Sequence, residues 1–495
     1  MSQKKNKGNK RAADPEWLVP PEQVAPAEPV AQPAQQIGRD NPSGSAPRLG
    51  EDSIYKIKDL GWPRSLLLGL QHLFAMFGAT VLVPLLTGLD VSTTLLMAGL
   101  GTLIFHLFTR GKVPAFLGSS FAFLGGYAAV APLTDGVADP VKLAYAGGGV
   151  AISGLVYILL AGLIKLFGVQ RVMRFFPPVV TGPIIISIGL ILAPTAIQNC
   201  STNWGVALVA IVVVIVCNIW GRGMVKIVPI MIGILVSVLF AIFTGGMQMD
   251  GLRGAGVFAL PLHPTQFARF DISSIITILP ISLATIMEHI GDVSAIGATT
   301  GRNYIADPGL HRTLLGDGIA TSFSALFGGP ANTTYGENTG VLVLTKVYDP
   351  KVTRLAAYFS IILSFFPVVS TLIRSIPAAT IGGVSLILYG TISAIGARNL
   401  VENKVDFTKS RNLIIAALIL VSALGFNALG GITFVVAGVS IQLSGLAIAA
   451  VLGVVLNMIL PGKDYVFSVE EPQDTGVNFS AVDTSQEGRS GHIEN

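Results

Sequence analysis

The strongest constraint on the fold of this chain is a succession of long apolar stretches separated by short polar segments. A helix needs about 20 apolar residues to cross the hydrocarbon core of a bilayer. Of the 495 residues, 51% are hydrophobic and 12% are charged, which is about half the charged share of a soluble domain. We therefore expect an all-α membrane protein with fourteen membrane segments, at residues 65–87, 91–108, 115–131, 143–167, 177–196, 205–220, 227–244, 274–297, 312–328, 331–347, 354–373, 378–396, 412–428 and 438–460.

The Lys and Arg residues of the connecting loops support this count. Short cytoplasmic loops concentrate basic residues. With the N-terminus inside, the cytoplasmic connections carry twenty Lys and Arg residues, and the connections on the opposite side carry four. We therefore expect a multi-pass protein with both termini in the cytoplasm. Because the basic residues are scattered between apolar stretches, the net charge of +4 does not indicate nucleic-acid binding.

Two of the expected membrane segments are interrupted by small and polar residues. The third contains the break 114–121 and the tenth contains the break 329–336, each with Pro, Gly, Ser, Thr or Asn and an aromatic residue. Fourteen is twice seven, an odd number, so a duplicated half would be inverted relative to the other half. Paired interrupted segments in corresponding positions indicate the binding site of a transporter. The alternative is a pair of loosely packed helices with small-residue contacts.

Three carboxyl side chains lie inside apolar segments, namely Glu288 and Asp292 in the eighth and Glu337 in the tenth. A charged side chain at membrane depth costs about 2.5–3.5 kcal/mol, so each is a functional candidate. Glu288 and Asp292 are four residues apart and share one helical face. Two acids in one pocket of low dielectric constant favour retention of a proton, as proton coupling requires. The alternative, a purely structural carboxylate, is weakened because no Lys or Arg lies deep in a segment.

The second break also suggests the shape of the solute. A helix that starts within the membrane points its free N–H groups into a cavity. These donors, the carboxyl groups and the aromatic residues Phe121, Tyr335 and Tyr389 suit a small planar solute with alternating N–H and C=O groups. A pyrimidine-dione fits, and so do purines and other amides. His72 and His289 also lie at membrane depth, where histidine often serves only in helix packing.

Other classes of protein fit the sequence less well. Neither a Gly-x-Ser-x-Gly motif nor a His-Glu-x-x-His motif is present, so we do not expect an enzyme. Cys200 and Cys217 have no metal-ligand spacing to a histidine, and we expect no metal site and no cofactor. An open channel is disfavoured, because titratable groups gathered at one membrane depth fit binding with alternating access better.

Four segments of the chain resemble the bacterial uracil permeases of the nucleobase/ascorbate transporter (nucleobase:cation symporter-2) family. They are Gln71–Thr80, Gly118–Phe123, Asp307–Arg312 and Asn332–Gly340. The family signature, Asn-x-Gly followed after four residues by Thr, is matched at Asn338, Gly340 and Thr345. The resemblance extends from about Trp62 to Leu460.

The resemblance implies proton-coupled uptake of uracil, or of a related nucleobase, across the bacterial inner (plasma) membrane. It implies two inverted seven-segment repeats, short strands at the breaks of segments 3 and 10, and an elevator-like movement of a core domain against a gate domain. It also allows for a homodimer in the lipid bilayer. The expected parts are an N-terminal cytoplasmic disordered tail (1–60), the core domain (61–168 and 273–375), the gate domain (169–272 and 376–462) and a C-terminal cytoplasmic disordered tail (463–495).

Individual roles follow from the same resemblance. Glu288 and Glu337 would bond the nucleobase ring, and the backbone N–H groups of Phe121 and Gly336 would meet its carbonyls. Ala79 would contribute through water, while Tyr335 and Tyr389 would pack nearby. The candidates for proton coupling are Glu288, Asp292, Glu337 and His72.

One position departs from the uracil pattern. The uracil members of the family that this chain resembles carry His at the position of Asp292, whereas purine members often carry Asp there. A xanthine or urate permease of the same fold is therefore the first alternative. A second alternative is an anion transporter of the sulfate/bicarbonate type. Such a protein would prefer neutral or basic groups at the breaks, and Glu337 argues against it.

Overall fold

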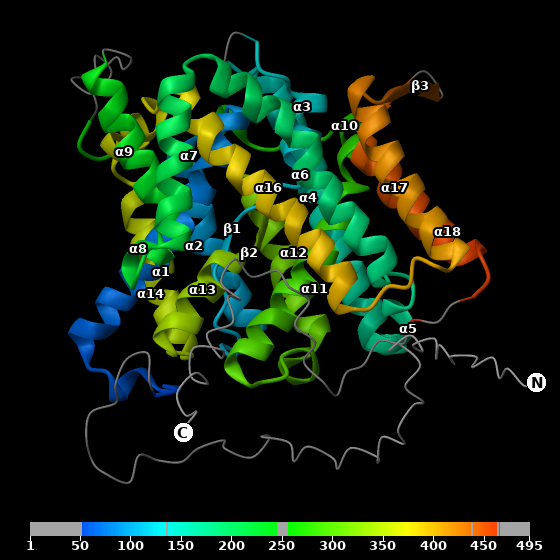
Figure 1. Ribbon diagram of the computed structural model, residues 1–495, viewed down its shortest axis with the longest axis horizontal. Coiled ribbons are helices and arrows are strands. Elements are labelled where there is room, and N and C mark those ends of the chain that lie inside the picture. Colours follow the sequence, from blue (N-terminus) through cyan, green and yellow to red (C-terminus); the bar gives the residue numbers. More distant parts are fainter. Residues whose placement is uncertain (1–51, 135–136, 245–255, 437–438, 463–464, 466–495) are drawn as a thin grey trace, which may run out of the picture. The chain divides into compact units, whose positions relative to one another are not determined.

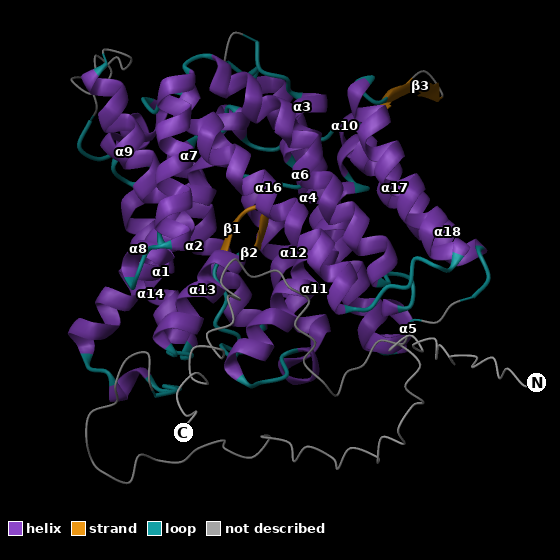
Figure 2. Ribbon diagram, viewed as in Figure 1, coloured by secondary structure: helices purple, strands orange, loops and turns teal. Residues whose placement is uncertain are grey.

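The computed structural model of the chain describes residues 52–134, 137–244, 256–436, 439–462 and 465. Residues 1–51 of the expected N-terminal tail lie outside these ranges, and so does the expected C-terminal tail apart from residue 465. The described chain is almost entirely helical, with two short strand pairs (Figure 2). The predicted all-α class is confirmed at this level.

Among the residues that the structure describes, the first half of the chain contains one strand and nine α-helices. Proline occupies the first turn of several of these helices, where its missing N–H is not needed. Asp90 and Asp139 each cap a helix by accepting a backbone N–H group at 2.8 Å. The elements are η1 (Ile57–Asp59), α1 (Trp62–Thr87), α2 (Val91–Phe108), β1 (Leu117–Ser119), α3 (Leu124–Val130), α4 (Pro140–Phe167), α5 (Val169–Met173), α6 (Pro178–Ser201), α7 (Trp204–Ile219), α8 (Met224–Ile227) and α9 (Pro229–Phe243).

The described part of the second half contains three strands and the remaining helices. The elements are η3 (Pro264–Gln266), α10 (Ile272–Ile278), α11 (Ile281–Thr300), η4 (Ile305–Gly309), α12 (Leu310–Leu326), β2 (Asn332–Thr334), α13 (Gly336–Thr345), α14 (Pro350–Ser364), α15 (Pro367–Arg374), α16 (Ala378–Glu402), α17 (Ser410–Ala428), β3 (Ile432–Val436), β4 (Val439–Leu443) and α18 (Gly445–Ile459).

Seven helices among the described residues are long and apolar enough to cross a membrane, namely α1, α2, α4, α6, α10 continued by α11, α16 and α17. The number becomes eight if α14 and α15, which meet at a bend of 86°, form one span. Three shorter apolar helices, α7, α9 and α18, have 15 or 16 residues. The chain is therefore a multi-pass membrane protein, and the count of fourteen segments stays a prediction.

The two interrupted segments meet in the strand pair β1–β2. The strands are antiparallel, with Leu117 opposite Thr334, Gly118 opposite Thr333 and Ser119 opposite Asn332. All six residues are buried, and the pair lies among the helices rather than at their edge (Figure 1). The predicted strands at the two breaks are thus present, and residues more than 200 positions apart in the sequence are paired.

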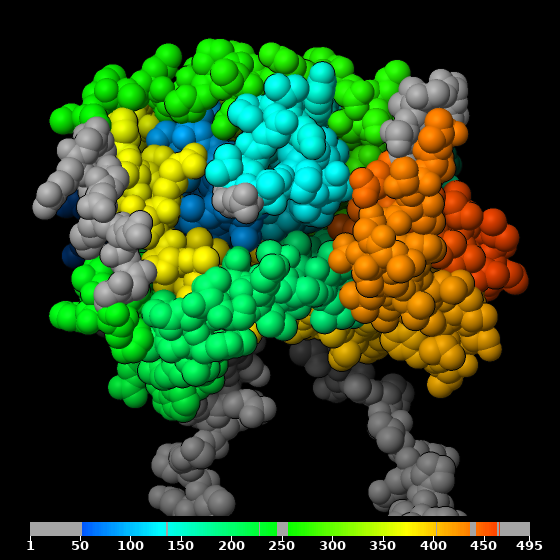
Figure 3. Space-filling view, turned by 90° about the horizontal axis from the view of Figure 1, so that it is seen from above, coloured from blue at the N-terminus to red at the C-terminus, as the bar shows by residue number. Residues whose placement is uncertain are grey.

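Helices from the two halves of the chain interleave. α2 packs against α12 and α14, α4 packs along α12, and α6 packs along α16. In the space-filling view, blue atoms of the first membrane helices adjoin yellow atoms from the second half (Figure 3). Near the C-terminus, α17 packs against α18 and α6. The core is therefore built from both halves together.

The residues that precede α1 are held against the second half. Ile54 donates its N–H to the carbonyl of Lys346 and accepts the N–H of Tyr348, each at 2.8 Å. Its side chain belongs to a small buried cluster with Leu60 and Val347. Residues 54–60, which belong to the expected disordered tail, therefore pack against the second half of the chain.

Candidate functional site

The strand pair β1–β2 and the start of α13 form the framework of the site. Ser120 extends the pairing by donating its N–H to Ala331 at 2.9 Å, and Tyr335 donates its N–H to Phe116 at 3.1 Å. α13 begins directly afterwards at Gly336, and no side chain caps its first turn. The first N–H groups of a helix have no partner within the helix and remain available as donors. The first N–H groups of α13 are therefore available as hydrogen-bond donors next to the second strand.

A cavity of about 40 Å³ lies at this framework. Its polar wall comes from α11 and from the residues around the two breaks, while α6 and α16 supply an apolar wall. The lining residues are Phe121, Ile185, Glu288, Asp292, Thr334, Tyr335, Gly336, Glu337, Leu388, Ile392 and Ile395. The structure thus brings together six of the residues singled out in the sequence, namely Phe121, Glu288, Asp292, Tyr335, Gly336 and Glu337.

The three predicted carboxyl groups share this cavity. Glu288 and Glu337 are half-buried, whereas Asp292 is 1% exposed. The Thr334 hydroxyl donates a hydrogen bond to Asp292 Oδ2 at 2.7 Å. Within the described part of the chain, Asp292 Oδ1 and Glu288 Oε2 have no hydrogen-bond partner. Free acceptor oxygens therefore remain at the cavity, where they are able to receive N–H donors of a ligand or hold a proton.

Aromatic side chains complete the walls of the cavity. The rings of Phe121 and Tyr389 meet edge to face, with 6.2 Å between centroids. Tyr389 is buried behind Phe121 and does not itself line the cavity. The Tyr335 hydroxyl donates to the Ser119 carbonyl at 2.8 Å, so this ring spans the strand pair. A Cβ at Gly118 would lie 2.4 Å from the Tyr335 ring, which explains why glycine is needed at that position.

The remaining predicted residues lie outside the cavity lining. Ala79 on α1 is fully buried in a hydrophobic cluster that includes Phe121, Tyr335 and Tyr389. His72 is also fully buried, and its Nδ1 lies 3.2 Å from Nδ2 of Asn338.

The three signature residues belong to α13. Asn338 Nδ2 also donates to the backbone carbonyl of His72, so the first signature residue joins α13 to α1. Gly340 is half-buried in the same helix, and Thr345 donates its hydroxyl to the Val341 carbonyl near the C-terminus of that helix. Of the three signature residues, Asn338 thus links the helix that carries Glu337 to α1.

A fourth buried carboxyl group, Asp317 on α12, escaped the sequence analysis. Its Oδ2 lies 2.9 Å from Nδ1 of His289, and both side chains are completely buried. The prediction of three acids inside apolar segments is therefore wrong, because residue 317 falls within the expected segment 312–328. The rule that singled out Glu288 applies equally to Asp317 and would have found it. His289 faces this partner, and it does not line the cavity.

The arrangement is suited to binding and proton exchange rather than to bond cleavage. It offers carboxyl acceptors, the donors of a helix start and flat apolar walls around one small cavity. Within the described ranges, no group of three His, Cys, Asp or Glu side chains is placed to hold a metal ion. A buried site of this kind, formed at interrupted segments of a multi-pass membrane protein, defines the class of the membrane transporters.

Comparisons with known proteins identify the family. The family model described as "Permease family" matches residues 63–432, and the chain belongs to this family. It is similar to the uracil permease of Bacillus caldolyticus, with 42% identity over 409 residues that cover 80% of this chain and 92% of the relative. The uracil permease of Bacillus subtilis (strain 168) is 40% identical over 416 residues, which cover 79% and 91%. The resemblance to bacterial uracil permeases is confirmed, and the protein is a transporter and not an enzyme.

A solved structure shares the fold. The transmembrane domain of the cyanobacterium bicarbonate transporter BicA superposes with a TM-score of 0.57 at 16% identity, and the match covers 76% of this chain and 98% of that chain. At this identity the likeness concerns the fold alone.

Proposed function

We propose that this protein is a secondary transporter that takes up uracil together with protons across the bacterial plasma membrane. The observation that carries the proposal is the cavity at which Glu288, Asp292 and Glu337 meet the start of α13. Relatives at about 40% identity that are named uracil permeases support uracil as the solute. The excess of basic residues in alternate loops supports cytoplasmic termini.

In this proposal the polar wall of the cavity recognises the ring of the solute. Glu288 and Glu337 accept the ring N–H groups, and the N–H groups of Phe121 and Gly336 donate to the carbonyls. Tyr335 forms a wall, and Tyr389 supports Phe121 from behind. Ala79 lies buried in the same cluster, so its proposed contribution through water requires rearrangement of that cluster.

The proton is carried by the carboxyl groups of the cavity. Glu288, Asp292 and Glu337 line the cavity together. Because like charges at close range in a low-dielectric site repel one another, ionisation of all three carboxyl groups at once is disfavoured. His72 takes part indirectly in this proposal, since its ring contacts Asn338 one position after Glu337. Uptake therefore depends on an inward proton gradient.

We infer that the fourteen segments form two inverted repeats of seven, and the packing pattern supports this. In two repeats of seven, each segment corresponds to the segment whose number is seven higher, with numbers above fourteen counted again from one. The contact between segments 2 and 11 (α2 and α14) then corresponds to the contact between segments 9 and 4 (α12 and α4). The same operation converts the pair α7 and α9 into α17 and α18, and all four contacts are present. The pairs β1–β2 and α6–α16 are converted into themselves, as expected for elements that lie at a twofold axis.

The two walls of the cavity support the proposal of an elevator-like movement. The polar wall belongs to the proposed core domain, and the apolar residues Ile185, Leu388, Ile392 and Ile395 belong to the proposed gate domain. A smooth apolar surface has no directional bonds to the solute, so the core is able to slide along it with the solute attached. The fold shared with the bicarbonate transporter does not favour an anion as solute, because three carboxyl groups line the cavity.

A thermal-shift panel tests the choice of solute. A ligand that binds the folded state at 100 times its Kd stabilises it by about 2.7 kcal/mol. We expect uracil to raise the melting temperature of the purified full-length protein more than thymine, xanthine, urate or ascorbate does. Glu337→Ala should abolish the shift, whereas Asp307→Asn, which alters an exposed carboxylate, should retain it.

Two outcomes of this panel contradict the proposal. A larger shift with xanthine or urate would assign the site to purines, as the aspartate at position 292 suggests. A uracil shift that is unchanged in Glu337→Ala would remove Glu337 from the site.

A further inference from the structure

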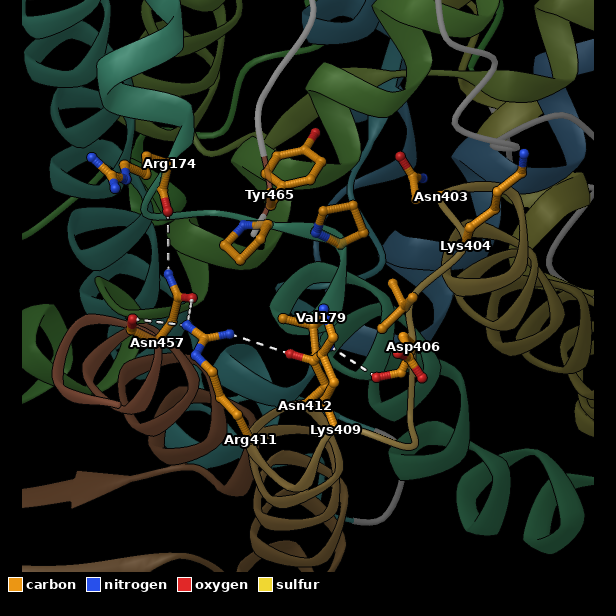
Figure 4. A pocket seen from close by; sticks show the side chains of 13 residues that line it. Arg174, Val179, Asn403, Lys404, Asp406, Lys409, Arg411, Asn412, Asn457 and Tyr465 are labelled. Atoms are coloured by element: carbon orange, nitrogen blue, oxygen red, sulfur yellow. Dashed lines mark hydrogen bonds between the residues drawn. The ribbon is translucent and has the colours of Figure 1, made fainter. Parts of the chain in front are cut away.

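A second cavity lies apart from the transport site, where the ends of several helices meet (Figure 4). Its volume is about 170 Å³. Its walls come from the segment that enters α6, the loop between α16 and α17, the last turn of α18 and Tyr465. Because the ends of membrane helices lie near the headgroup region of a bilayer, this cavity is at the height of lipid phosphates.

The lining is strongly basic. Of the described residues that line the cavity, four are basic and one is acidic: Arg174, Lys404, Lys409 and Arg411 against Asp406. The carboxylate of Asp406 accepts the hydroxyl and the N–H of Thr408 at 2.6 and 2.9 Å, and these bonds lower its pKa. Even with this aspartate ionised, the lining keeps a positive excess that attracts anions.

One of the basic groups is fixed in place by a buried amide. Arg411 Nη2 donates to Asn457 Oδ1 at 2.6 Å, and Asn457 Nδ2 donates to the carbonyls of Arg174 and Phe175 at 3.2 Å each. Asn457 is only 3% exposed. The bonds of Asn457 to Arg411 and to Arg174 are seen as dashed lines in Figure 4, and they join α17, α18 and the segment before α6. The guanidinium is therefore held rigidly at the cavity wall.

The positive ends of two helices reinforce this charge. α6 begins at Pro178 and α17 begins at Ser410, and both starts adjoin the cavity. Neither helix has a side-chain cap on its first N–H groups. A helix N-terminus carries partial positive charge and favours phosphate or carboxylate groups.

Apolar side chains lie beside the basic cavity on the same helices. Leu413 and Ile414 on α17 are 54% and 45% exposed, and Ile459 on α18 is 72% exposed. α17 is one of the helices long enough to cross a membrane, and its outward apolar side chains suit contact with acyl chains. A ligand with a phosphate next to hydrocarbon chains therefore matches both parts of this surface.

We propose that this cavity binds the headgroup of an anionic phospholipid, with the acyl chains against α17 and α18. The chemistry is recognition of phosphate by guanidinium, ammonium and helix N-termini, which inorganic phosphate shares without the acyl chains. The bound lipid fixes α6, α17 and α18 relative to one another. This proposal is independent of the transported solute, because the cavity and the transport site have no lining residue in common.

Native mass spectrometry of the full-length protein tests the proposal by counting bound lipids. Dioleoyl phosphatidylglycerol should bind more tightly than dioleoyl phosphatidylcholine. Lys404→Gln combined with Lys409→Gln should weaken phosphatidylglycerol binding about 30-fold. Each basic side chain near an anionic headgroup contributes about 1 kcal/mol, and two such contributions correspond to about this change in affinity. Both lysines are exposed, so the variant should fold, which size-exclusion chromatography checks.

The matched control carries Arg222→Gln and Lys226→Gln, which remove two basic side chains outside the cavity. It should keep the wild-type affinity within about twofold. Equal binding of the two lipids, or an unchanged affinity in the lysine variant, would overturn the proposal. Displacement of phosphatidylglycerol by an equal concentration of inorganic phosphate would assign the cavity to a free anion and would also overturn it.

Discussion

Replacing Thr334 by valine removes the hydroxyl that donates to Asp292 Oδ2 over 2.7 Å and leaves the side-chain shape almost unchanged. Both residues are 1% exposed. Among the described residues Asp292 Oδ1 has no partner, so the valine variant leaves both carboxyl oxygens unpaired. Leaving a buried polar atom without a hydrogen-bond partner costs about 1–3 kcal/mol, and valine is well tolerated in a strand. We expect the free energy of unfolding to fall by about 1–3 kcal/mol.

The assay is SDS-induced unfolding of the purified protein, followed by tryptophan fluorescence. Thr334→Ser retains the hydroxyl and loses one methyl group, so its loss should stay near 0.8 kcal/mol, roughly one buried carbon. A double-mutant cycle with Asp292→Ala isolates the interaction between the two side chains. A coupling energy below about 0.5 kcal/mol in this cycle would refute the reasoning, because it would mean that the hydrogen bond stabilises neither residue.

Two further substitutions test the framework of the site and the buried contact between Asp317 and His289. Gly118→Ala places a Cβ 2.4 Å from the Tyr335 ring, so it should destabilise the protein by about 1–3 kcal/mol in the same assay. Gly125→Ala, where nothing lies within 4 Å, should not, and equal losses would speak against the close packing of Gly118. Asp317→Asn replaces the carboxyl group that lies 2.9 Å from His289 in a fully buried pair and should cost about 1–3 kcal/mol, whereas Asp307→Asn at an exposed pair should cost less than about 1 kcal/mol. Similar losses of unfolding free energy in these two variants would mean that the buried pair stabilises the protein no more than the exposed pair does.

The sequence predicted the location of the site better than its internal bonds. Carboxyl groups inside apolar segments and the two polar breaks are local signals, and the structure brings Glu288, Asp292, Glu337 and both breaks together. The register that places Gly118 opposite Thr333 depends on tertiary packing, which no local pattern encodes. The hydrogen bond from Thr334 to Asp292 follows from that register and was not predictable for the same reason.

Breaks in apolar helices were also missed where the residues around them are themselves apolar. α14 and α15 meet at 86° around Phe365 and Phe366, and a hydropathy average treats this region as one segment. Pro367 marks the start of the new helix, as expected for a residue without an N–H group. The hairpin β3–β4 precedes α18, although the expected segment 438–460 treated its second strand as part of a helix. The β-branched residues at 432, 433, 435 and 436 were the available sign of a strand.

The most direct test of the central claim is uptake of labelled uracil by the purified protein in liposomes, with and without an inward proton gradient. The account predicts faster uptake with the gradient, and loss of uptake in Glu288→Gln and in Glu337→Gln. Asp307→Asn, which changes an exposed carboxylate, should transport as the wild type does. Equal uptake after the gradient is collapsed, or full activity in both glutamine variants, would contradict proton-coupled transport through this cavity.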